Sequence, residues 1–285
     1  MELKVLLEFI KLEHTLFSLP FVFIGALLAG DPSITQLLWI FVAAIGARGL
    51  AMTLNRIIDK DVDAANPRTA QRHLPSGRMS MRSAWSLSFI FLSMLLLGAW
   101  RLNMIALQLA WIPVLAFVIY PFLKRRTWLC HLWLGICLGL APAGAWLGVY
   151  GVDAGWDAVS GMHWWPQLFL VCFAVMLWIS AFDLGYSQMD IDSDLANGIY
   201  SFPARFGPQT AIKAAVILTL LWGTSLAIAV QELWWQAATA LMVVANIIVL
   251  TSSRNDMVAF QNRLFRTSVS TGWVLLAGLS IGLFI

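Results

Sequence analysis

Charged residues are scarce in this chain. Asp, Glu, Lys and Arg together make up 12% of its 285 residues, whereas hydrophobic residues make up 60%. A soluble domain of this length would carry about twice as much charge to keep its surface hydrated. The composition therefore excludes a soluble globular protein and indicates an integral membrane protein.

Cysteine is nearly absent as well. The three cysteines, Cys130, Cys137 and Cys172, all lie in apolar stretches, and they form no CxxC pair and no metal-ligand spacing. This pattern gives no sign of a cysteine-based metal site, so we expect the three side chains to be small core residues.

The long apolar stretches lack the alternation of apolar and polar residues that membrane-spanning strands require, so helices remain as the spanning element. They cover residues 9–30, 36–58, 83–100, 103–121, 128–150, 166–186, 209–230, 232–251 and 267–285. We therefore expect an all-α integral membrane protein, a bundle of nine transmembrane helices that forms one domain over residues 1–285. In the fifth stretch, the pairs Gly135/Gly139 and Gly144/Gly148 predict close helix packing.

The positive charges are distributed unevenly. Of the 18 Lys and Arg residues, 15 lie near the N-terminus or in alternate loops, and only Arg101 lies in a loop of the opposite side. The positive-inside rule then predicts a cytoplasmic N-terminus and an external C-terminus in a multi-pass protein of the inner (cytoplasmic) membrane.

Two acidic motifs end two of the apolar stretches. Asn55, Asp59 and Asp63 are spaced four apart at the end of the second stretch, and Asp190 and Asp194 have the same spacing at the end of the sixth. Residues four apart share one face of a helix. The topology places both motifs on the cytoplasmic side, so we expect a site that faces the cytoplasm.

Two carboxylate clusters at one membrane surface repel each other unless positive charge lies between them. Mg²⁺ prefers a few carboxylates together with phosphate oxygens and water, and Arg68, Arg72, Lys124 and Arg125 occur at the same level. This mixture suits a metal-clamped diphosphate. The alternative is that these acids and bases only form salt bridges at the ends of the helices.

Polar residues inside the spans add further candidates. Arg48 lies two turns before Asn55 on nearly the same face, and a charged residue in a span costs a few kcal/mol unless it has a partner or a polar cavity. Asp183 shares a face with Asp190 and Asp194, and Tyr186 precedes the second motif.

At these residues the sequence resembles the UbiA superfamily of intramembrane aromatic prenyltransferases. Asn55-x3-Asp59-x3-Asp63 is similar to its first aspartate-rich motif, Asp190-x3-Asp194 to its second, and Tyr120-x3-Lys124 to its YxxxK signature. The similarity extends from His14-Thr15 to Gly207. It implies nine helices, use of a polyprenyl diphosphate with Mg²⁺, and a role in a lipid-quinone pathway.

The resemblance also implies residue roles. Metal binding would fall to Asn55, Asp59, Asp63, Asp190 and Asp194. The expected catalytic residues are Asp59, Asp63, Asp190, Asp194, Arg48 and Lys124. Substrate binding would fall to Arg48, Asn55, Arg68, Arg72, Tyr120, Lys124, Asp183 and Tyr186. Among these, Lys124 and Arg68 would contact the diphosphate, and Arg48 the carboxylate of the acceptor.

Within the superfamily, the chain looks most like enzymes that act on 4-hydroxybenzoate or on 1,4-dihydroxy-6-naphthoate. It departs from many 4-hydroxybenzoate enzymes at Glu13-His14, where those have Asp-Arg-Pro, and at Asn55-Arg56, where those have Asn-Asp. Both departures lean toward the menaquinone-pathway relative. They concern the acceptor and leave the metal chemistry unchanged.

We therefore expect Mg²⁺-dependent transfer of a polyprenyl group to an aromatic acid. The partners would be a polyprenyl diphosphate, a small aromatic acid and membrane lipid, with no nucleic acid. Three alternatives stay open: an ion-coupled transporter, which needs acids near mid-bilayer, a membrane scaffold without activity, and prenyl transfer to haem, archaeal lipid, tocopherol or chlorophyll precursors. His14 and His73 are candidates for proton removal or ordinary loop histidines.

Overall fold

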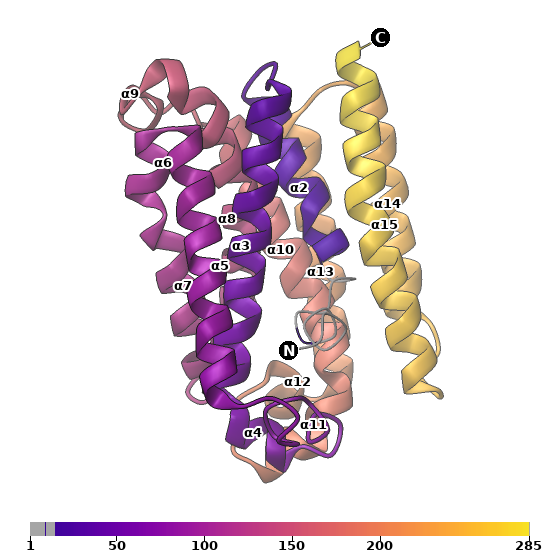
Figure 1. The fold of residues 1–285 in the computed structure, drawn as a ribbon. Helices are drawn as coiled ribbons and strands as arrows, with labels where there is room; N and C mark the ends of the chain where they lie inside the picture. Colours follow the sequence, from indigo (N-terminus) through magenta and orange to yellow (C-terminus); the bar gives the residue numbers. More distant parts are fainter. Residues whose placement is uncertain (1–8, 10–14, 285) are drawn as a thin grey trace.

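The computed structural model describes residue 9 and residues 15–284, and every regular element in that part of the chain is a helix. Long helices run side by side along a common axis, and short helices lie at the two ends of the bundle (Figure 1). The all-α membrane fold predicted from the sequence is confirmed. His14 and Glu13 lie outside the described residues.

In chain order the elements are α2 (Thr15–Leu28), α3 (Ile34–Ile58), α4 (Lys60–Ala65), α5 (Met81–Leu102), α6 (Met104–Leu109), α7 (Trp111–Leu123), α8 (Cys130–Ala154), α9 (Asp157–Ser160), α10 (Gln167–Tyr186), the 3-10 helix η2 (Ser187–Asp190), α11 (Ile191–Ala196), α12 (Phe202–Phe206), α13 (Pro208–Ala229), α14 (Leu233–Thr251) and α15 (Met257–Phe284).

Eight helices in the described part of the chain are long and apolar enough to cross a membrane, with α6 and α7 counted together as one span of 20 residues. The first predicted span corresponds to α2, which has 14 residues. A full span needs about 20 residues, so the number of nine transmembrane helices stays a prediction. The eight long apolar helices support a multi-pass membrane protein.

Local signals in the sequence explain where the site helices begin and end. Ser33 caps the start of α3, since its hydroxyl accepts from the Gln36 backbone N–H while the Gln36 side chain accepts from the Ser33 N–H. At the other end, the backbone N–H of Asp59 donates to the Asn55 carbonyl and closes α3. The first acidic motif therefore passes from the last turn of α3 into α4.

Two large apolar cores hold the bundle together. One joins α2, α10, α13, α14 and α15 around the fully buried Trp222 and Trp235. The other joins α3, α5 and α7 around Leu50, Phe91 and Phe117. Helix α8 packs against α10 and α2 of the first core and against α7 of the second, and so connects the two.

One end of the bundle collects both acidic motifs. Helices α4, α11 and α12 lie together there with the loop 66–80, and we call this group of segments the cap (Figure 1). Helix α9 and the last turn of α15 lie at the opposite end. The two motifs therefore share one end, as the sequence predicted.

Candidate active site

A cavity of about 480 Å³ runs between α2, α3, α5, α7, α8 and α10. Most of its wall is apolar, and alanines such as Ala43, Ala99 and Ala141 leave the space open. Its lining extends from Arg68 and Arg72 in the cap to residues of the α5–α6 turn at the other end. The cavity thus crosses most of the bundle and has one polar end.

The charged residues of the wall are mostly positive. Among the described residues that line the cavity, the cations are four arginines and the single carboxylate is Asp183. The arginines are Arg48, Arg56, Arg68 and Arg72. Such a wall attracts an anionic group, because positive charge in a low-dielectric space is poorly screened.

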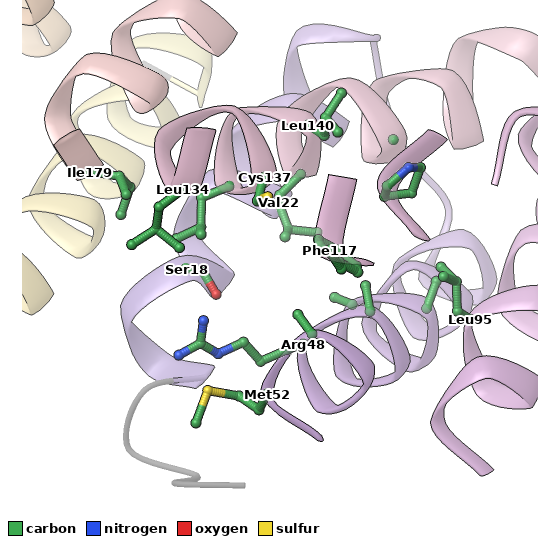
Figure 2. Close-up of a pocket in the computed structure, with 18 of the residues that line it drawn as sticks. Ser18, Val22, Arg48, Met52, Leu95, Phe117, Leu134, Cys137, Leu140 and Ile179 are labelled. Atoms are coloured by element: carbon green, nitrogen blue, oxygen red, sulfur yellow. The ribbon is translucent and has the colours of Figure 1, made fainter. Parts of the chain in front are cut away.

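Seven of the eight residues predicted to bind substrate lie on this wall: Arg48, Asn55, Arg68, Arg72, Tyr120, Asp183 and Tyr186. Lys124 directly follows α7 and is not on the wall; it pairs with Asp59 instead. The guanidinium group of Arg48 points toward Ser18 of α2, in a space bordered by Val22, Leu134 and Ile179 (Figure 2). Its Nε atom is buried and has no hydrogen-bond partner in residues 15–284 or at residue 9.

Asp59 is the most deeply buried acid of the first motif, with an exposed fraction of 0%. Its carboxylate forms a salt bridge with Lys124 Nζ, lies 3.3 Å from Arg125 Nη2 and accepts from Asn55 Nδ2 at 3.1 Å. The end of α7 is therefore bound to the end of α3 by charge.

The other acid of that motif, Asp63, is held by the loop that follows it. Both carboxylate oxygens accept from Arg72 Nη1, at 2.7 and 2.8 Å. The Asp63 carbonyl also accepts from the Thr69 hydroxyl at 2.8 Å. These bonds fold the loop back onto α4.

The same loop reaches the second motif. Arg68 forms a bidentate pair with Asp190, with Nε and Nη2 donating at 2.8 and 2.7 Å, and Asn66 Nδ2 donates to Asp190 at 2.8 Å. Burial lowers the pKa of Arg68, but the hydrogen bond and the charge of Asp190 outweigh it and raise the pKa above its usual value. Asp194 follows one turn later, within electrostatic range of Asp190 and Lys124. The two acidic motifs are thus joined by one loop.

These acids suit Mg²⁺ in donor type, since carboxylate and amide oxygens converge on the cap from both motifs. In the described residues, however, no three metal-ligating side chains are close enough together to form a ready site. Asp59, Asp63 and Asp190 are each paired with a cation instead. These three carboxylates could hold a metal ion only if the cations that now pair with them bound another anion instead.

Sequence reasoning missed His131. Its Nδ1 lies 2.7 Å from Asp183 Oδ2, and its Nε2 accepts from the Phe202 backbone N–H at 3.0 Å. Since Nε2 is an acceptor, Nδ1 carries the proton and donates to Asp183. The signal was available, because His131 is an ionisable residue in an otherwise apolar stretch. His73 is buried beside Phe9 and is not part of the described cavity wall.

Fold and site together define a membrane-embedded helical protein with one long cavity in the described part of the chain, apolar along most of its wall and positively charged near the cap. The model of the UbiA prenyltransferase family matches residues 18–269. The chain belongs to this family.

Curated relatives are similar along much of the chain. A 4-hydroxybenzoate octaprenyltransferase of Psychromonas ingrahamii is 29% identical over 259 residues, which cover 89% of this chain and 85% of the relative. One of Vibrio campbellii is also 29% identical, but the match covers 66% of this chain and 62% of the relative. The chain thus spans less than two thirds of the Vibrio protein.

Solved structures agree with the fold. The apo structure of a UbiA homologue from Aeropyrum pernix K1 has a TM-score of 0.84 and 31% identity, and covers 95% of this chain and 98% of its own. A UbiA homologue from Archaeoglobus fulgidus, bound to DMAPP and Mg²⁺, has a TM-score of 0.67 at 17% identity, with 95% of this chain and 99% of that chain covered. At that identity the likeness concerns the fold alone.

Proposed function

We propose that this protein transfers a polyprenyl group from a polyprenyl diphosphate to an aromatic acid, either 4-hydroxybenzoate or 1,4-dihydroxy-6-naphthoate, with Mg²⁺ as cofactor. One observation carries the proposal: a long apolar cavity whose charged wall residues are four arginines and one aspartate, beside two acidic motifs. An apolar tail fits the alanine-rich part, and the diphosphate fits the end near the cap.

Asn55, Asp59, Asp63, Asp190 and Asp194 would hold the metal, which neutralises the charge of the departing diphosphate when bound. Arg68, Arg72 and Lys124 now pair with three of these carboxylates. In the proposed complex they donate to the diphosphate oxygens instead. The same cations thus hold the two motifs together before the substrate arrives and bind the leaving group afterwards.

The wall residues near this end suit a carbocation. When the allylic C–O bond breaks, the bonding electron pair stays with the diphosphate and the prenyl carbon becomes positive. The rings of Tyr120, Phe182 and Tyr186 line the cavity there, and aromatic faces stabilise a cation without trapping it. The acceptor carbon ortho to a phenolic hydroxyl then forms the new C–C bond. We assign removal of the ring proton to Asp183, which His131 orients.

Arg48 is the candidate for the acceptor's carboxylate. It lines the cavity, and it forms no ion pair within the described part of the chain. The names of the curated relatives favour 4-hydroxybenzoate, whereas Arg56 in the first motif favours the naphthoate. An ion-coupled transporter is less well supported, because the acids of both motifs lie at helix ends and three of them, Asp59, Asp63 and Asp190, are paired with cations.

The test is an assay of purified protein with geranyl or farnesyl diphosphate, Mg²⁺ and a panel of aromatic acids, with products identified by mass spectrometry. We expect Asp59→Ala and Asp190→Ala to lower turnover at least about a hundredfold, because charge stabilisation of the leaving group is lost. Asp61→Ala and Asp192→Ala are matched controls from the same motifs. Both of these side chains are exposed, and we expect near-normal turnover.

Turnover close to wild type in Asp59→Ala and Asp190→Ala would contradict the metal assignment. Uptake of sodium, protons or calcium by liposomes that carry the pure protein, without prenylated product, would favour the transporter.

A further inference from the structure

Arg56 is a buried cation that the proposed mechanism does not yet use. It lies on α3 directly after Asn55, lines the cavity, and has an exposed fraction of only 4%. Its Nε atom is buried and has no hydrogen-bond partner among the described residues. Its guanidinium group lies over the ring of Phe9, 4.9 Å from the ring centre, and forms no ion pair in the part of the chain that the structure describes.

Such a side chain is costly to keep. A buried charged residue in a spanning helix is unfavourable unless it has a partner or faces a polar cavity. The ring of Phe9 offsets part of this cost, but it supplies no hydrogen-bond acceptor. An uncharged residue of the same shape would serve the packing better, so packing alone does not explain an arginine at this position.

The charges around Arg56 also favour an anion. Arg72 and Asp63 are both within electrostatic range of its guanidinium group. Both carboxylate oxygens of Asp63, however, already accept hydrogen bonds from Arg72. Among the described residues two arginines thus share one aspartate, which leaves one positive charge in excess at this corner of the cavity.

We propose that Arg56 binds the diphosphate group of the prenyl donor, a role that rests on the proposed function. The position of Arg56 on α3 favours binding of the prenyl donor rather than the aromatic acceptor, because Arg56 directly follows Asn55 and precedes Asp59 by less than one helical turn. Arg48 lies eight residues earlier, about 12 Å along the helix axis, and would serve the acceptor. Arg56 also differs from Arg68 and Arg72, because within the described part of the chain it has no ion pair to break before it binds.

The test measures binding of inorganic pyrophosphate with Mg²⁺ to purified wild type, Arg56→Met and Arg101→Met, by thermal shift and calorimetry. A charge-assisted hydrogen bond contributes about 1.5–3 kcal/mol, so Arg56→Met should bind roughly 10- to 100-fold more weakly. Its melting temperature without ligand should not fall, because a buried charge is removed.

Arg101 is the matched control. It lies over the ring of Trp39 at 5.0 Å, a similar stacking contact, but it is at the opposite end of the bundle and off the described cavity wall. We expect Arg101→Met to bind pyrophosphate like wild type. Arg56→Lys keeps the charge and is the second variant if the methionine variant does not fold. It should bind pyrophosphate between wild type and the range expected for Arg56→Met.

The inference is overturned if Arg56→Met binds pyrophosphate as tightly as wild type does. It is also overturned if both Arg56→Lys and a folded uncharged variant do so. A loss confined to the KM for the aromatic acid also overturns it and assigns Arg56 to the acceptor. If wild type itself neither binds Mg²⁺-pyrophosphate nor forms product, the proposed function fails. Wild-type turnover with normal binding by Arg56→Met contradicts the role of Arg56 alone.

Discussion

At the scale of single residues, what distinguishes the charged groups of this protein is whether they have partners. Asp59, Asp63 and Asp190 are each matched by a cation, and these bonds assemble the cap. Arg48 and Arg56 form no ion pair within the described residues and line the cavity. The unpaired cations are therefore the ones best placed to bind a ligand without breaking an existing contact.

For Arg48 we expect the substitution Arg48→Ala to raise the KM for the aromatic acid at least about tenfold, in line with the loss of one charge-assisted hydrogen bond. The KM for the prenyl diphosphate should change little, because the diphosphate is assigned to the cap end. Steady-state kinetics with each substrate varied in turn give both values.

Arg205→Ala is the control for this prediction. Arg205 is also cationic, but its side chain is exposed and it lies off the described cavity wall. Equal losses for donor and acceptor in Arg48→Ala would remove the assignment of Arg48 to the acceptor.

At the scale of elements, the glycines of α8 have two different roles: some allow close contact with a neighbouring helix, and one lines the cavity. A Cβ atom on Gly135 would clash with the Met176 carbonyl oxygen of α10, and one on Gly139 would lie 2.8 Å from the Cys172 carbonyl oxygen. One on Gly148 would approach Leu102. Close packing is thus confirmed for these three. The prediction of close packing is wrong for Gly144, because an added Cβ atom there would have no neighbour within 4 Å and the residue lines the cavity.

We therefore expect Gly135→Ala to lower the thermal stability of the purified protein, by about 1–3 kcal/mol, since the added methyl group forces α8 and α10 apart. Gly144→Ala is the matched control on the same helix and should melt like wild type. Thermal unfolding in one detergent compares the two. Equal melting temperatures for both variants would contradict the packing account.

At the scale of the whole molecule, the bundle has two different ends. The cap contains both acidic motifs and the loop 66–80, and α9 lies at the other end (Figure 1). The positive-inside rule predicts that the cap faces the cytoplasm, from which the aromatic acid and Mg²⁺ of the proposed reaction would reach the cavity. The orientation of the site in the membrane follows from this prediction.

Single cysteines test this orientation. We expect Ala196→Cys in the cap to react with a membrane-impermeant maleimide only after right-side-out vesicles are opened, and Ser160→Cys at the end of α9 to react in intact vesicles. Both positions are exposed, while Cys130 and Cys137 are buried and Cys172 is partly buried. The reverse pattern would place the cap outside the cell.

The sequence by itself determined the membrane class, because an apolar chain with so little charge has no soluble alternative. It also determined that the two acidic motifs share one end of the bundle, because charge placement sets the topology and four-residue spacing sets the helix face. Four wall residues, Arg48, Asn55, Asp183 and Tyr186, were predictable for the same reason, since they lie on the inner faces of α3 and α10.

Only the tertiary structure decided which cation meets which acid. Arg68 pairs with Asp190 across 122 residues of sequence, and His131 pairs with Asp183 across 52. It also decided that Arg56 faces the cavity and that Gly144 leaves space in it. Helix periodicity shows which residues share a face of one helix. Pairs of residues far apart in the sequence depend on how separate helices pack, and this packing is set by many contacts spread over both cores.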